Sequence, residues 1–206
     1  MIEHYLKTDE QEEAVSALES FAEWSNRVEP QIDYWRWVVL ALHNAVQGFM
    51  VLALRGSDGL RPLRNDVAEA WLTAYREGGE YPKEKLDSFL NLYKKIKSDI
   101  MLLFVHSRKF TPTGSQGRSI KQLNSLRNQF IHFLPRSWLL EVSGLPQICL
   151  DCLKIIEFLS WECGNVFWHD HVMKTRTETA MKDAKAALEH LNIIYIGCPA
   201  GECSQT

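Results

Sequence analysis

The chain has 206 residues, which is long enough to bury the core of one domain. Its 46% hydrophobic and 24% charged residues exclude an intrinsically disordered protein, and its net charge of −3 excludes a protein whose overall positive charge attracts nucleic acid. The five cysteines, an odd number, argue against a disulfide framework and favour a reducing compartment.

Neither a secretion signal nor a membrane span is expected. Residues 1–14 lack the basic and apolar regions of a signal peptide. Apolar runs such as those around residues 37–42 and 101–105 are much shorter than a membrane span. We therefore expect a cytoplasmic protein that does not insert into a membrane.

The apolar residues recur mainly at helical spacing, which predicts an all-α fold: an antiparallel bundle of about five core helices with additional flanking helices. In chain order, helices are expected over about residues 9–27, 32–55, 66–76, 83–104, 120–134, 146–163 and 176–191. We expect one domain over residues 1–206, with its core at about 31–161 and a C-terminal helix and loose tail over 166–206.

Glycine, proline and capping residues mark the ends of these helices. The helix over 32–55 is apolar around most of its circumference, which predicts that it is buried. Ser119 and Gln122 have the spacing of a capping box, and Pro135 is expected to end the helix that follows. Residues 192–196 are the one β-prone segment.

The helix before Pro135 carries Arg127, Asn128 and His132. Asn128 and His132 share a helix face, and the long side chain of Arg127 can reach the same side. An imidazole beside a fixed cation can act as an acid and a base on a phosphodiester. The alternative is that Arg127 is a surface residue and His132 a hydrogen-bonded core residue.

The helix over 32–55 contains a polar stripe of His43, Asn44 and Gln47 inside an apolar sequence. Buried polar groups need hydrogen-bond partners, and the face with Arg127 and His132 is the obvious counterpart. The stripe therefore either lines a site or forms a network that ties two core helices together.

The segment Arg127-Asn128-Gln129-Phe130-Ile131-His132 resembles the Arg-x4–6-His motif of the HEPN superfamily. Residues 42–54, LHNAVQGFMVLAL, are similar to an early core helix of that family, and the resemblance covers about residues 31–161. It implies a homodimer of helical bundles in which the two motifs face each other.

In active members the resemblance implies metal-independent RNA cleavage without a cofactor. The ribose 2′-OH attacks the adjacent phosphate and a cyclic phosphate remains. Carried over, His132 would be the acid–base group, Arg127 would bind the phosphate, and Asn128 would orient or contact the phosphate. A toxin, stress or defence role, with an antitoxin or another protein as partner, fits the family. Some members are silenced at a Tyr two residues after the His, where this chain has Leu134.

Other members have lost activity, so the alternative is a non-catalytic module that binds protein or RNA. Arg118, Lys121, Arg127 and Arg136 lie around the motif and are candidates for binding RNA. Nothing in the sequence indicates specificity for DNA. Two aromatic residues nearby, Phe133 and Trp138, can stack an unpaired base, or can simply serve core or dimer packing.

Three other segments contain residues that could bind a metal ion or a phosphate, but each has a simpler interpretation. Cys149 and Cys152 have metal-site spacing but lie in a core-helix pattern, which favours packing. His169-Asp170-His171 could bind a metal ion together with Cys163, but adjacent residues on a helix point apart, so we expect no metal site there. The glycine-containing loop 111–119 lacks the Gly-Lys-Ser/Thr ending of a phosphate-binding loop.

Overall fold

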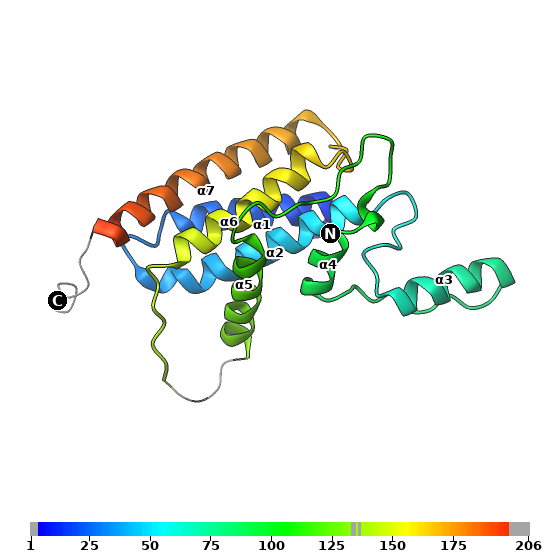
Figure 1. The fold of residues 1–206 in the computed structure, drawn as a ribbon, viewed down its shortest axis with the longest axis horizontal. Coiled ribbons are helices and arrows are strands. Elements are labelled where there is room, and N and C mark those ends of the chain that lie inside the picture. The colour runs from blue at the N-terminus through cyan, green and yellow to red at the C-terminus, as the bar shows by residue number, and fades with distance from the viewer. Residues whose placement is uncertain (1–3, 133–134, 136, 198–206) are drawn as a thin grey trace.

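The computed structural model describes residues 4–132, 135 and 137–197. It confirms the all-α prediction: seven α-helices are present, and no strand occurs among the described residues. A single antiparallel bridge joins Leu63 to Leu86. Figure 1 shows the long helices side by side in an elongated body, with shorter helices crossing it and a helix that projects to the side.

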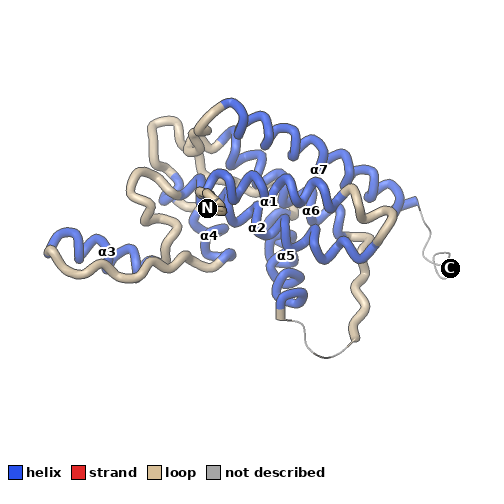
Figure 2. Tube along the Cα trace, turned by 180° about the vertical axis from the view of Figure 1, so that it is seen from behind, coloured by secondary structure: helices blue, strands red, loops and turns tan. Residues whose placement is uncertain are grey.

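The elongated body consists of α1 (Glu10–Ser25), α2 (Trp35–Leu54), α6 (Leu145–Glu157) and α7 (His171–Gly197). Helix α1 packs against both α2 and α7, and α6 packs against α2 and α7 (Figures 1 and 2). The first and last helices therefore contribute to the core, together with the segment 31–161 that we expected there.

Helix α2 is the central element. Of its 20 residues, 13 are buried, as the apolar circumference predicted. A β-carbon added to Gly48 would lie 2.9 Å from Cα of Ala14, so α1 and α2 approach each other closely at this glycine.

Residues Ile32–Leu54 form a helical stretch that is long and apolar enough, by length and composition, to cross a membrane. This stretch is longer than the apolar runs at 37–42 and 101–105 because it includes polar and charged residues, and the expectation that the chain does not insert into a membrane stays a prediction. In the bundle, 67% of the most apolar part of this stretch is buried, as in the core helix of a globular protein.

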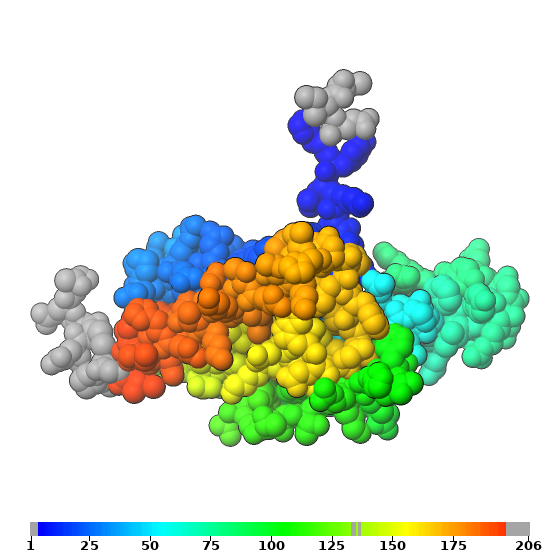
Figure 3. Space-filling view, turned by 90° about the horizontal axis from the view of Figure 1, so that it is seen from above, coloured from blue at the N-terminus to red at the C-terminus, as the bar shows by residue number. Residues whose placement is uncertain are grey.

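Helix α3 (Asn65–Glu77) projects from the body, and only Ala74 within it is buried (Figures 1 and 3). Its base is held by Lys95, whose ammonium group pairs with Asp87 at 2.8 Å and donates to the carbonyls of Arg61 and Leu63. Both side chains of the pair are buried, so a desolvated ion pair helps to hold the base of α3 to the body.

The helix expected over 83–104 is much shorter. Helix α4 spans Phe89–Lys95, and a 3-10 turn follows at Asp99–Met101. The chain folds back at this point, because the carbonyl of Ile96 accepts a hydrogen bond from the N–H of Phe110 at 2.9 Å. The apolar side chains of Leu102 and Phe104 consequently remain about half exposed.

Helix α5 spans Gln116–Ile131 and begins four residues earlier than predicted. Ser119 is not its cap, because its hydroxyl donates to the buried carboxylate of Asp151 at 2.7 Å. The β-prone assignment of residues 192–196 is wrong, since α7 continues through them and the Tyr195 hydroxyl accepts a hydrogen bond from the Trp35 indole. The tail from Cys198 lies outside the described residues.

Candidate functional site

Helix α5 has one covered and one open face. Ile120, Leu123 and Leu126 are buried where α5 packs against α6, α2 and α4. The opposite face is exposed and carries mainly polar or basic side chains, with Ile131 and the capping His132 at its end: Arg118, Lys121, Gln122, Ser125, Asn128 and Gln129. The helix therefore presents its hydrogen-bonding groups to solvent along its whole length.

Arg127 lies at the border between the two faces and is half-buried. Its Nη1 donates to the Oδ1 atom of Asn128 at 3.1 Å, and its buried Nε has no hydrogen-bond partner. In the described part of the chain no carboxylate pairs with this guanidinium, which leaves its charge available to an anion.

His132 is the C-terminal cap of α5 and its side chain is exposed. Its backbone N–H donates to the carbonyl of Asn128 at 2.9 Å, which places it at the start of the turn that leaves the helix. No hydrogen bond joins the side chains of Arg127 and His132 in the described residues. The imidazole is accessible to solvent and is not packed into the core of its own chain.

The three residues of the polar stripe on α2 do not share one environment. His43 is only 3% exposed, faces α5 with Nε2 at 3.3 Å from Oδ1 of Asn124, and stacks on the Phe89 ring at 3.9 Å. Asn44 and Gln47 instead line a groove between α1 and α2. Successive helical residues point about 100° apart, so a single stripe meets two different neighbours.

The environment of His43 keeps it neutral. Burial lowers the pKa of this imidazole to about 4, against the opposing hydrogen bond to Asn124, and the positive charge of Arg127 lowers it further. His43 therefore contributes to the α2–α5 interface and is not poised to exchange a proton near neutral pH. Asn124, which the sequence analysis missed, lies one helical turn before Arg127 and could have been found by that spacing.

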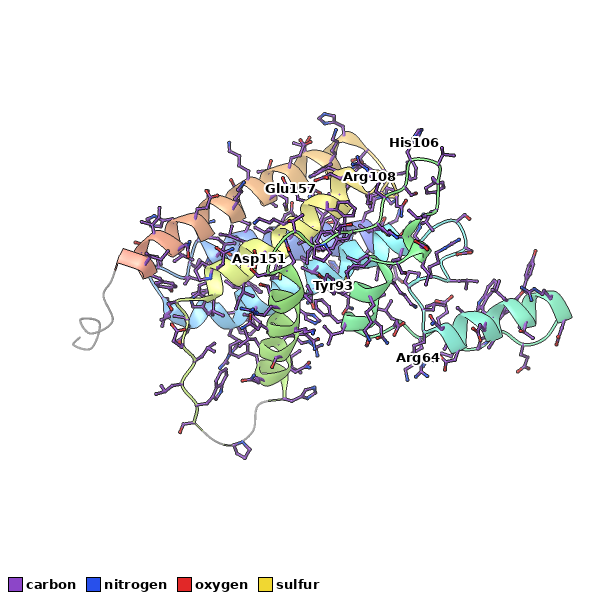
Figure 4. All side chains as sticks on the ribbon, in the orientation of Figure 1. Arg64, Tyr93, His106, Arg108, Asp151 and Glu157 are labelled. Carbon is purple, nitrogen blue, oxygen red and sulfur yellow. The ribbon has the colours of Figure 1, made fainter. Side chains whose placement is uncertain are left out.

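The positive charge around α5 is a regional feature of the sequence. From residue 100 to residue 140 there is no Asp or Glu, while six Lys or Arg residues occur. Arg118 and Lys121 are exposed on α5, whereas Arg136, Phe133 and Leu134 lie outside the described residues. His106 and Arg108 are on the opposite side of the molecule from the C-terminal end of α5 (Figure 4), so they do not add to this surface.

Asp151 lies on α6, and its carboxylate faces α5 (Figure 4). It is 4% exposed and accepts hydrogen bonds from Ser119 at 2.7 Å and from Gln147 at 3.1 Å. Its charge is therefore enclosed in the interface and does not neutralise the exposed face of α5.

The cysteines of α6 are core residues. Cys149 and Cys152 are almost completely buried, and burial raises the pKa of both thiols. In the part of the chain that the structure describes, no three His, Cys, Asp or Glu side chains are grouped to hold a metal ion. His169 pairs with Asp9 and His171 contacts Thr175, so the two histidines turn to different partners.

Comparison of the chain with models of protein families, with curated proteins and with solved structures found no match.

Proposed function

We propose that the protein is a metal-independent endoribonuclease of HEPN type that acts as a homodimer in the cytoplasm. The observation that carries this proposal is the open end of α5. Within two helical turns, this end carries Arg127, which has no carboxylate partner among the described residues, Asn128, which is hydrogen-bonded to it, and the exposed His132. The sequence around them, residues 100–140, contains no acidic residue. This combination suits a phosphodiester, which needs both a cation and a proton-exchanging group.

The proposed reaction requires no group beyond these side chains and the substrate. The 2′-oxygen of the ribose attacks the adjacent phosphorus while its proton passes to a base. The bond from phosphorus to the 5′-oxygen breaks, and that oxygen receives a proton from an acid. His132 is the acid–base group, Arg127 stabilises the charge that grows on the phosphate oxygens, and Asn128 orients Arg127 through the 3.1 Å hydrogen bond.

A dimer supplies the second acid–base group. One histidine cannot be protonated and deprotonated at once, but a two-fold axis along the exposed faces of α5 would bring two copies of His132 and Arg127 to one phosphate. Sedimentation or light scattering should therefore give a mass of twice the chain. A strict monomer at high micromolar concentration would remove the composite site.

Cleavage is tested with mixed RNA in EDTA, scoring cyclic-phosphate ends. The wild-type protein should cleave, and Arg127→Ala and His132→Ala should lower the rate by about 10²–10⁴-fold. His190→Ala is the matched control, because His190 is an exposed histidine on α7 paired with Glu29. Equal cleavage by all variants would show that these residues are not the site, and no cleavage by any would favour a non-catalytic binding module.

The toxin, stress or defence setting is tested in cells. Expression of the wild-type chain should arrest growth, and His132→Ala should relieve the arrest. A neutralising antitoxin or other partner protein should then restore growth of cells that carry the wild-type chain. Arrest that persists in His132→Ala would separate any toxicity from the proposed cleavage.

A further inference from the structure

An aromatic pair lies at the C-terminal end of α5, beside the proposed site. The rings of Phe130 and Trp138 are 5.4 Å apart at their centroids, with 49° between their planes. The guanidinium of Arg36, on α2, is 5.9 Å from the centre of the Phe130 ring. Phe130 is one helical turn after Arg127 and two residues before His132. Helix α5, helix α2 and the segment that carries Trp138 therefore meet at the C-terminal end of the Arg127–His132 motif.

The two aromatic rings have different roles in the fold. Phe130 packs against the hydrophobic core and is held by α5. Trp138 belongs to the irregular segment between α5 and α6, is partly exposed, and rests on Phe130. The tryptophan is thus the outer ring of a two-ring stack whose inner ring is fixed. A stack of this kind offers a rigid apolar surface at a small cost in conformational entropy.

The charges next to this stack match a nucleotide better than another protein surface or an apolar ligand. Neither Arg36 nor Arg127 is paired with a carboxylate in the described residues, and the sequence from residue 100 to residue 140 contains no acidic residue. An aromatic face flanked by unpaired guanidinium groups binds a base by stacking and its phosphates by charge.

We propose that Trp138, supported by Phe130, is a stacking subsite for an unpaired nucleobase of RNA, and that Arg36 and Arg127 hold the flanking phosphates. The assignment of RNA as the molecule that is cleaved rests on the proposed function, whereas the binding subsite can be tested without cleavage. A base inside a duplex cannot reach the tryptophan ring, so the subsite selects single-stranded RNA.

The test measures binding of fluorescein-labelled single-stranded RNA, of mixed sequence, to the full-length His132→Ala protein by anisotropy. Adding Trp138→Ala should weaken binding by on the order of ten- to hundredfold, the usual effect of losing one stacked base. Trp138→Phe should restore most of the affinity. Trp161→Ala is the matched control, because Trp161 is a partly exposed tryptophan on a different segment, packed against Trp168.

Two ligand controls keep the inference falsifiable even if Trp138→Ala folds poorly. An abasic oligomer of the same length, and an RNA duplex, should bind the protein with intact Trp138 more weakly than single-stranded RNA does. Equal binding of the abasic oligomer, absence of RNA binding, or equal affinity of Trp138→Ala and Trp138→Phe would each overturn the subsite.

Failure of the subsite and failure of the proposed function give different results. If the wild-type protein does not cleave RNA but binding still depends on Trp138 and on the bases, the nuclease proposal fails and the subsite stands. If the wild-type protein cleaves RNA but binding is indifferent to Trp138, the subsite is wrong and the nuclease proposal stands.

Discussion

Helices α2 and α5 carry the same kinds of polar residue in opposite surroundings. His43 of α2 is enclosed between Asn124 and Phe89, and the pKa of its imidazole is about 4. His132 of α5 lies at an open helix end in a region without acidic residues. His43 lies inside its helix and can only support an interface, whereas His132 caps its helix and is open to solvent. The surroundings of a side chain, more than its type, determine its chemistry.

The largest expected effect separates activity from stability. His132→Ala should lower RNA cleavage by about 10²–10⁴-fold and change the free energy of unfolding by no more than about 0.5 kcal/mol, because the side chain is exposed. His43→Ala should instead destabilise the fold by about 2–4 kcal/mol through the cavity it leaves. Cleavage assays and urea unfolding of both variants give the comparison. A large loss of stability in His132→Ala would contradict it.

The second effect is a pH dependence of stability that originates at His43. The folded pKa of about 4 is below the ordinary 6.5, so the unfolded chain binds the proton more tightly. The contribution is fully present above pH 6.5 and is lost as the pH falls from 6.5 to 4, by up to about 3 kcal/mol.

Urea unfolding of the wild-type protein and of His43→Leu between pH 4 and 7 measures this contribution. Arg127 is the charged group whose effect on His43 adds to that of burial, and it remains protonated throughout. The stability of His43→Leu should depend less steeply on pH. Parallel curves for the two proteins would show that His43 does not titrate in this way.

A third effect concerns the covered face of α5. Ser119→Ala removes a hydrogen bond to the buried carboxylate of Asp151, which retains Gln147 as a donor. Hydrogen bonds to charged groups contribute about 1.5–3 kcal/mol, and we expect a loss of this size in thermal or urea unfolding. Ser125→Ala, on the exposed face of the same helix, is the control and should be nearly neutral.

The smallest effects on stability are expected for glycine substitutions in α2 and α5. Gly48→Ala should destabilise the protein by about 1–3 kcal/mol, because its new β-carbon would lie 2.9 Å from Ala14 of α1. Gly117→Ala on α5 meets only the Tyr93 hydroxyl, at 3.9 Å, and should stabilise by about 0.4–1 kcal/mol. Melting temperatures of the two variants should therefore shift in opposite directions from that of the wild-type protein. Shifts in the same direction would contradict this prediction.

Local sequence patterns were enough to predict most of the fold. The apolar circumference of α2 predicted its burial, and glycine and proline residues marked helix ends that the structure contains. These signals act within one helix, because side-chain periodicity and backbone restrictions do not depend on distant parts of the chain. The Arg127–Asn128 pair was also recognisable, since its members are adjacent in the sequence.

Contacts between distant segments decided the rest. Helix α4 ends at Lys95 because the chain turns back and Phe110 takes the Ile96 carbonyl, a bond that no local pattern reveals. The contact between Asn124 and His43 likewise depends on how α2 packs against α5.

The sequence by itself determined that the chain is all-helical and that residues 100–140, which include Arg127 and His132, contain basic but no acidic residues. Only the tertiary structure decided which histidine is buried, which polar residues of α2 face α5, and that Trp138 rests on Phe130. The physical reason is that burial and charge depend on what covers each face of a helix. The covering side chains come from distant segments, as Asn124, 81 positions along the chain, does for His43.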